Sequence, residues 1–166
     1  MNEKTISIFM KKVLLIIIIF ATTTFGISCS SSKNATSLTP TNSHLAGKWT
    51  ISNIAVDVPS GFQVTNVFDE APYADFKGST WDLIRNGNGS FTLTNGTKEN
   101  IYWSIFGKGD NAQFQFKKLN GEKARNVTEG YRLALGPISS NSFTAKSIIN
   151  TGTNSTGSIT YTFTKQ

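Results

Sequence analysis

The sequence has very little of the chemistry that enzymes and metal sites need. Its 166 residues include one cysteine, Cys29, and one histidine, His44. One cysteine excludes an intramolecular disulfide, and these two residues provide no zinc ligand set at ordinary spacings. A Ser-His-Asp triad would need His44 as its base, but the chain has no Gly-x-Ser-x-Gly elbow. We therefore expect no catalytic residue, no metal, no cofactor, and a protein that is not an enzyme.

Two weaker motifs have simpler explanations. Asp69, Glu70 and Asp75 are close enough in sequence to form a paired-carboxylate site, but a solvated loop explains them better because nothing around them predicts burial. Gly87 and Gly89 lack a third glycine and a strand–helix context. They predict a turn rather than a phosphate-binding loop.

The excess of positive charge is small. Of the 16 basic and 10 acidic side chains, three lysines and one glutamate lie in residues 1–28, which leaves 13 and 9, a net charge of +4. The nearest approach to a basic cluster consists of Lys108, Lys117, Lys118, Lys123 and Arg125. We interpret this cluster as the solvated face of a hairpin. Because no nucleic-acid motif accompanies it, we expect no nucleic-acid partner.

The first 28 residues have the layout of a secretory signal. Lys4, Lys11 and Lys12 precede a dense apolar run over residues 13–21, and threonines and a glycine interrupt the sequence after it. A basic segment followed by a short apolar run is typical of a signal peptide. A membrane-spanning helix needs about 20 predominantly apolar residues, so a retained anchor is the weaker alternative.

Cys29 follows this signal segment directly, with the small residue Ser28 before it. The sequence Phe25-Gly26-Ile27-Ser28-Cys29 resembles the lipobox of bacterial lipoproteins. This resemblance implies cleavage before Cys29 and attachment of fatty acyl chains such as palmitate, which would tether the protein to a membrane. The alternative is an ordinary free thiol near a cleavage site.

Residues 30–43 are almost wholly small and polar. Such a segment cannot bury enough apolar surface to offset its ordering entropy, so we expect residues 29–43 to form a lipidated, flexible tether. Surface-exposed lipoproteins of the Bacteroidota often carry an acidic run after the cysteine, whereas this tether has Lys33 and no acid. The expected location is therefore the outer membrane, with the protein lipid-anchored and facing the periplasm.

Residues 44–166 predict a single β domain. Apolar and polar residues alternate with a period of two, as in half-buried strands, over residues 48–52, 80–83, 90–94, 101–105, 113–117, 131–135, 142–146 and 159–164. Sequences such as Asn86-Gly87-Asn88-Gly89 predict hairpin turns between them. Residues 57–78 are less regular and suggest a short strand around Phe62–Val64 and a helical turn around Val67–Ala71. Short antiparallel strands of this kind form an up-and-down barrel or a sandwich.

The sequence HLAGKWTI at residues 44–51 resembles the opening strand of lipocalin-like domains in Bacteroidota lipoproteins, which carry a Leu-x-Gly-x-Trp pattern. The hairpin from Trp81 to Phe91, the strand around Trp103 and the terminal segment 161–165 are similar to the same group. This resemblance implies an eight-stranded antiparallel up-and-down barrel over residues 44–166 that holds a small hydrophobic molecule. Lipocalins also pack an arginine over the first tryptophan, and Arg132 is the candidate here.

The aromatic residues of the predicted strands have two interpretations. We interpret Trp49 as a plug that closes one end of the barrel. The others either fill the interior or line a cavity, and the candidate ligand-binding residues are Trp81, Phe91, Trp103, Phe114, Phe116, Tyr131 and Tyr161. One hypothesis is a lipid-anchored barrel that binds a small apolar ligand. The other is a structural or protein-interaction lipoprotein whose filled barrel excludes such a ligand.

Overall fold

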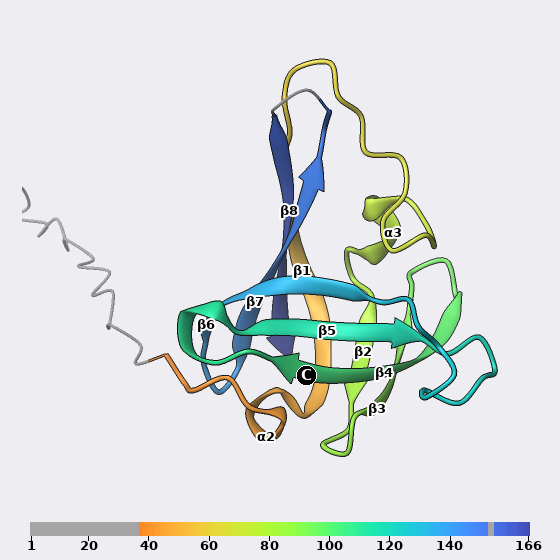
Figure 1. The fold of residues 1–166 in the computed structure, drawn as a ribbon, viewed down its shortest axis with the longest axis vertical. Helices are drawn as coiled ribbons and strands as arrows, with labels where there is room; N and C mark the ends of the chain where they lie inside the picture. Colours follow the sequence, from red (N-terminus) through yellow and green to blue (C-terminus); the bar gives the residue numbers. More distant parts are fainter. Residues whose placement is uncertain (1–36, 153–154) are drawn as a thin grey trace, which may run out of the picture. The chain divides into compact units, whose positions relative to one another are not determined.

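The computed structural model describes residues 37–152 and 155–166, and the eight strands of this part form one closed antiparallel barrel (Figure 1). The strands are β1 (Gly47–Asp57), β2 (Thr80–Leu83), β3 (Asn88–Thr92), β4 (Lys98–Phe106), β5 (Gln113–Lys118), β6 (Tyr131–Ile138), β7 (Ser142–Asn150) and β8 (Thr156–Lys165). Each strand pairs with the next, and β8 returns to pair with β1. The expected eight-stranded up-and-down barrel is confirmed. The signal segment, Cys29 and residues 30–36 of the tether lie outside the described residues.

Alternation along the strands places apolar side chains inside the barrel. Along β5, Phe114 and Phe116 are buried, while the residues between and beside them are only partly covered. Successive side chains of a strand point to opposite faces, so one register puts every second residue in the core. The pairing of Trp49 with Trp81, and of Trp81 with Phe91, then aligns three large rings across neighbouring strands.

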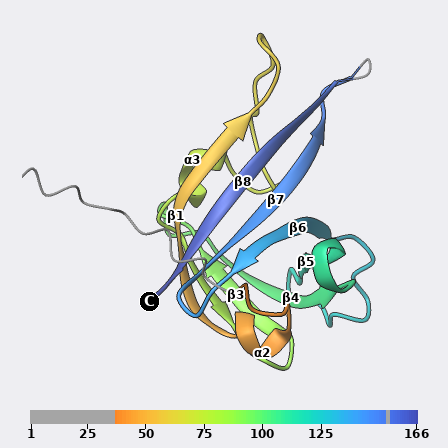
Figure 2. The same ribbon diagram turned by 90° about the vertical axis from the view of Figure 1, so that its left-hand side faces the viewer.

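Strands β7 and β8 and the second half of β1 extend past the other strands at one end of the barrel (Figures 1 and 2). β1 pairs with β2 only over residues 47–50, whereas its pairing with β8 continues to Asp57, with a bulge between Ile51 and Asn53. The connection from β1 to β2, residues 58–79, crosses this end. We call this end the mouth of the barrel.

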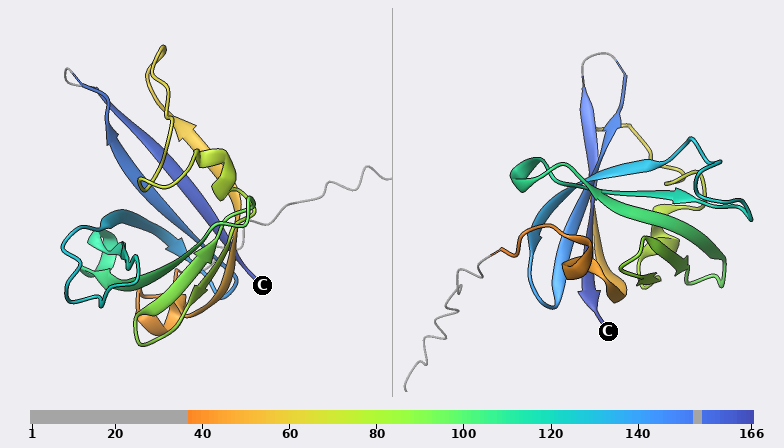
Figure 3. Two further views of the ribbon diagram at one scale, coloured as in Figure 1. Left: turned by 90° about the vertical axis from the view of Figure 1, so that its right-hand side faces the viewer. Right: turned by 60° about the horizontal axis from the view of Figure 1, so that its bottom comes forward.

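Helix α2 (Asn42–Leu45) lies at the opposite end, near the C-terminus (Figures 1 and 3). Trp49 is buried here, and its indole N–H donates to the Leu45 carbonyl at 2.8 Å. The Nζ atom of Lys165, which is paired with Trp49 in the β1–β8 register, lies 5.4 Å from the centre of the indole ring. This end is therefore closed by a packed tryptophan under a cation.

The cation over Trp49 is not the one expected from the sequence. Arg132 precedes buried Leu133 on β6 and lies on the outside of the barrel, with its guanidinium 4.4 Å from the centre of the Phe106 ring. The assignment of Arg132 is wrong because strand alternation points its side chain away from the interior. Lys165 occupies the position instead.

The chain contacts the barrel before the predicted end of the tether at residue 43. The Leu38 N–H donates to the Ile138 carbonyl at 2.8 Å, and the Ile138 N–H donates to Ser37 Oγ at 3.2 Å. His44 is exposed, and its Nδ1 lies 2.6 Å from the Thr39 carbonyl oxygen. The polar composition of residues 30–43 does not predict these contacts, because their partner, Ile138, lies on the distant strand β6.

The connection between β1 and β2 also differs from its prediction. Residues 62–64 form no strand, and Val67 and Ala71 form an isolated antiparallel bridge in place of the expected helical turn. Helix α3 (Tyr73–Phe76) begins only after Pro72, and a 3-10 turn, η1 (Gly109–Asn111), precedes β5. The bridge converts residues 67–71 into a tight turn, which we call the 67–71 turn.

The backbone conformation explains why this turn is not helical. Phe68 and Asp69 have φ angles of 56° and 46°, in the left-handed region that a right-handed helical turn excludes. The conformation directs the Phe68 side chain onto the mouth of the barrel, where it is 8% exposed.

Aromatic rings fill the barrel interior. Trp81 stacks on Phe91 with ring centres 4.8 Å apart, and it meets Phe116 edge-on at 5.4 Å. Phe143 and Phe163 stack at 4.3 Å. The other large buried rings are Trp49, Trp103, Phe76, Phe114 and Tyr161. Packed interiors of this kind gain dispersion and edge-to-face energy, and the rings occupy the space that a ligand inside the barrel would need.

Candidate functional site

The seven predicted ligand-binding residues divide into two groups in the structure. Five are buried in the interior and packed against other rings: Trp81, Phe91, Trp103, Phe114 and Phe116. Of the remaining two, Tyr161 on β8 is also buried and Tyr131 on β6 is partly buried, and both reach the mouth. Both line a pocket that Phe68 also lines, and Tyr131 and Phe116 together border a second concave surface, described below.

The mouth pocket has a volume of about 260 Å³ and lies between residues 62–68 and the strands β7 and β8. Val64, Ile149 and Ile159 contribute most of its aliphatic wall. Typical small-molecule pockets measure about 300–1,000 Å³ and are mainly apolar with a few polar groups. The mouth pocket lies just below this range, so it suits only a ligand smaller than drug size.

Tyr161 lines this pocket, and its hydroxyl has no hydrogen-bond partner among the described residues. The side chain is 1% exposed. Burial raises the pKa of Tyr161 well above its usual value, so the hydroxyl remains protonated at neutral pH. A buried hydroxyl without a partner destabilises a fold by about 1–3 kcal/mol. One residue of the pocket wall thus carries a buried hydroxyl that no described residue bonds, which is uncommon in a native interior.

Tyr131 holds the 67–71 turn from the β6 side of the mouth. Its hydroxyl lies 2.7 Å from the Phe68 carbonyl oxygen and 3.0 Å from the Asp69 carboxylate. Partial burial, followed by the hydrogen bond and the negative charge of Asp69, raises the pKa of Tyr131. The hydroxyl therefore stays protonated and donates to the turn.

Lys118 holds the same turn from β5. Its ammonium group lies 2.9 Å from the Glu70 carboxylate and 3.0 Å from the Asp69 carbonyl oxygen. The two charged side chains are only 14% and 15% exposed, so solvent screens the pair weakly. The sequence predicted that Asp69, Glu70 and Asp75 lie in a solvated loop. This prediction is wrong for Glu70, because Lys118, on a strand that is distant in sequence, pairs with it. Asp75 does not join them and instead accepts from the Asn95 side chain at 3.2 Å.

Phe68 is the residue of the mouth that sequence reasoning missed. Its ring packs edge-on against Phe76, Phe116 and Tyr131, with centre-to-centre distances of 5.3, 5.1 and 5.2 Å, and lies 5.3 Å from the Tyr161 ring. Phe68 and the aliphatic residues of the pocket wall come from separate segments of the sequence and form no common motif. Only the closure of the barrel brings residues 62–68 beside β7 and β8.

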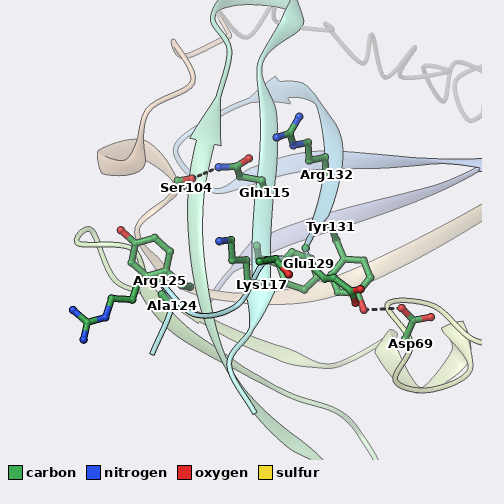
Figure 4. Close-up of a pocket in the computed structure, with 13 residues that line it drawn as sticks. Asp69, Ser104, Gln115, Lys117, Ala124, Arg125, Glu129, Tyr131 and Arg132 are labelled. Atoms are coloured by element: carbon green, nitrogen blue, oxygen red, sulfur yellow. Dashed lines mark hydrogen bonds between the residues drawn. The ribbon is translucent and has the colours of Figure 1, made fainter. Parts of the chain in front are cut away.

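A second concave surface, which we call the outer groove, has a volume of about 1,100 Å³ (Figure 4). It lies over the outer face of β4, β5 and β6 and beside the 119–130 loop. The Gln115 amide donates to Ser104 Oγ at 2.7 Å across its floor. Charged side chains of both signs line it: Asp69, Lys117, Arg125, Glu129 and Arg132. The outer groove is lined by charged side chains, whereas the lining of the mouth pocket has none.

In residues 37–152 and 155–166, no three histidine, cysteine, aspartate or glutamate side chains converge as a metal site. No helix of this same part is long and apolar enough to cross a membrane. In comparisons with known proteins, no protein-family model, curated protein or solved structure matches the chain. The geometry of the mouth pocket is therefore the basis for the function proposed below.

Proposed function

We propose that this protein is a lipid-anchored envelope protein whose lipocalin-like barrel binds a small apolar ligand at its mouth. The mouth pocket supports the proposal, because aliphatic walls from Val64, Ile149 and Ile159 surround a site whose only fully buried polar side chain, Tyr161, has no partner. The ligand binds at the end of the barrel because aromatic rings occupy the interior.

The lining of the mouth pocket defines the kind of ligand. All of the lining residues are uncharged, and their polar members are Gln63, Thr65, Asn66, Ser147 and the two tyrosines. A charged ligand would lose hydration there without gaining an opposite charge. A neutral molecule with an aliphatic or aromatic body and one polar group fits this lining best.

A series of straight-chain alcohols tests this proposal. The unit from Ala35 to Gln166 contains the whole closed sheet and the core cluster, so we expect it to fold on its own, and it serves as the test protein. Each buried CH₂ contributes about 0.8 kcal/mol. We expect the affinity to rise about fourfold per methylene from 1-butanol to 1-octanol, until the pocket is full. Titration followed by amide NMR shifts measures each dissociation constant.

Two neighbouring isoleucines on β7 provide a matched pair of variants. Ile149 lines the mouth pocket, whereas Ile148 points outward and is 62% exposed. Ile149→Ser should weaken 1-octanol binding, and Ile148→Ser should leave it unchanged. An affinity that does not depend on chain length, or an equal response of the two variants, would contradict a specific apolar site.

The second candidate is a structural or protein-interaction lipoprotein with a filled barrel. The packed interior favours it, and the polar outer groove offers a surface for such contacts. This candidate predicts no saturable binding of any alcohol in the series. The alcohol titration therefore discriminates between the two candidates.

The anchor at Cys29 is supported by the signal-like segment before it and the lipobox resemblance. Two or more acyl chains hold a protein on a membrane far more firmly than one, since each buried CH₂ adds about 0.8 kcal/mol. Growth with labelled palmitate should label the full-length chain, and Cys29→Ser should abolish the label. A labelled Cys29→Ser variant, or an unlabelled wild type, would rule out the anchor.

A further inference from the structure

The 67–71 turn covers part of the mouth by placing its own aromatic ring, Phe68, against the rings of the barrel. Four rings surround Phe68, and we call them the Phe68 cage: Phe76, Phe116, Tyr131 and Tyr161. Three of these contacts are edge-to-face, the geometry that the ring quadrupole favours. The cage thus already binds one phenyl group, which the chain itself supplies.

The backbone that carries this ring is strained. Phe68 and Asp69 are consecutive non-glycine residues with φ angles of 56° and 46°. A bulky residue in the left-handed region persists only when its surroundings compel it, and such residues cluster at ligand clamps and switch regions. Leaving the cage would release this strain.

Side chains provide the bonds that hold the turn on the barrel. They come from Tyr131, which donates to the turn at 2.7 Å, and from Lys118, which donates at 2.9 and 3.0 Å. Within the turn, backbone bonds join its own residues, Val67 to Ala71 and Glu70 to Val67. The turn is therefore a local unit that can move off the mouth without opening the ladder of the barrel.

Phe68 also lies beside Tyr161, whose hydroxyl is the only buried side-chain polar atom without a partner among the described residues. The Tyr161 ring lies 5.3 Å from the Phe68 ring, and its hydroxyl oxygen is inaccessible to solvent. Two destabilising features, a left-handed phenylalanine and an orphaned hydroxyl, therefore coincide at one place. Movement of Phe68 uncovers Tyr161 and relieves the first feature, and a ligand with a polar substituent relieves the second.

We infer that the Phe68 cage is a concealed binding site for a neutral aromatic ligand of the phenol class. The ligand ring replaces the Phe68 ring, its substituent forms a hydrogen bond with the Tyr161 hydroxyl, and the 67–71 turn moves outward. The inference rests on the proposed function and deepens it by naming the ligand class and the residue that the ligand displaces.

The first experiment titrates the wild-type unit Ala35–Gln166 with 4-methylphenol while the Phe68 ring and the amides of residues 67–71 are observed by NMR. We expect saturable binding in which the Phe68 ring signals lose their ring-current shifts as the cage is occupied by the ligand. Methylbenzene, which has the same body without the hydroxyl, is the matched probe.

Three variants separate the parts of the inference. Tyr161→Phe should lower the ratio of 4-methylphenol affinity to methylbenzene affinity by about two- to tenfold, the range of one net hydrogen bond. Phe68→Ala should raise the affinity for both probes, because no ring has to leave the cage. Phe106→Ala removes an exposed phenyl group from the end of β4, outside the cage and the mouth pocket, and should not raise either affinity. If Phe68→Ala does not fold, the wild-type ring signals still decide the question.

The outcomes distinguish this inference from the proposed function. Binding of 1-octanol at the mouth, with the Phe68 signals unchanged by 4-methylphenol, would overturn the concealed site alone. Failure of all probes to bind would overturn the proposed function as well. The ligand could displace Phe68 while the ratio of 4-methylphenol to methylbenzene affinity is the same in wild type and Tyr161→Phe. This result would refute the role of the hydroxyl, and with it the phenol class.

Discussion

Replacing Trp81 by alanine is expected to lower the free energy of unfolding by about 3–5 kcal/mol. The indole is 1% exposed and packs against Phe91, Phe116 and Phe163 at 4.8–5.6 Å. Its N–H also donates to the buried Ser79 hydroxyl at 3.0 Å. The variant therefore creates a cavity among rings that cannot collapse into it and removes a buried hydrogen bond. Urea denaturation of the unit Ala35–Gln166 measures the change.

Tyr102 provides the control for this prediction. It lies on the outer face of β4 and is 38% exposed, so Tyr102→Ala should cost less than about 1 kcal/mol. A Trp81→Ala variant as stable as Tyr102→Ala would show that the interior is not packed. A loosely packed native state exposes less additional surface on unfolding. The slope of the unfolding free energy against urea concentration would then be smaller in the same denaturation curves.

Replacing Tyr161 by phenylalanine is expected to raise the free energy of unfolding by about 1–3 kcal/mol. The substitution keeps the ring contacts of a side chain that is 1% exposed and removes only the hydroxyl, which has no partner among the described residues. A substitution that stabilises the fold but weakens phenol binding is the pattern expected of a residue kept for function.

Tyr131→Phe is the matched control, because it removes the same atom from a tyrosine whose hydroxyl is used. That hydroxyl lies 2.7 Å from the Phe68 carbonyl oxygen, so its loss should lower the free energy of unfolding by about 0.5–1.5 kcal/mol. The two variants should thus change stability in opposite directions. A loss of stability in Tyr161→Phe would mean that its hydroxyl is satisfied in solution, and the argument for a ligand there would fail.

The barrel was predictable because each strand carries its own pattern. In β5 the alternation of Phe114 and Phe116 with glutamines and lysine determines the inner face before any partner is known. The turn at 84–87 joins β2 and β3 with Gly87 at a φ of 94°, a conformation that glycine adopts without strain. Local alternation and turn chemistry therefore predict a sheet of short antiparallel strands.

The mouth was not predictable, because its parts meet only after the barrel closes. Residues 58–72 have no periodicity, so nothing local distinguishes Phe68 from the partly covered Phe62 beside it. The burial of Phe68 depends on rings from α3, β5, β6 and β8, and its backbone angle depends on bonds from Lys118 and Tyr131. Sequence reasoning identified Tyr131 and Tyr161 as inward-facing, but could not show that one hydroxyl is bonded and the other is not.

The central claim is that the barrel is filled inside and open to ligands at its mouth, and the location of bound 1-octanol tests it most directly. Amide and methyl NMR shifts, or a crystal structure of the complex, give this location. We predict contacts with Val64, Ile149 and Ile159 and no change around Trp81 and Phe114. Octanol among the interior rings, or bound on the outer groove alone, would contradict the claim.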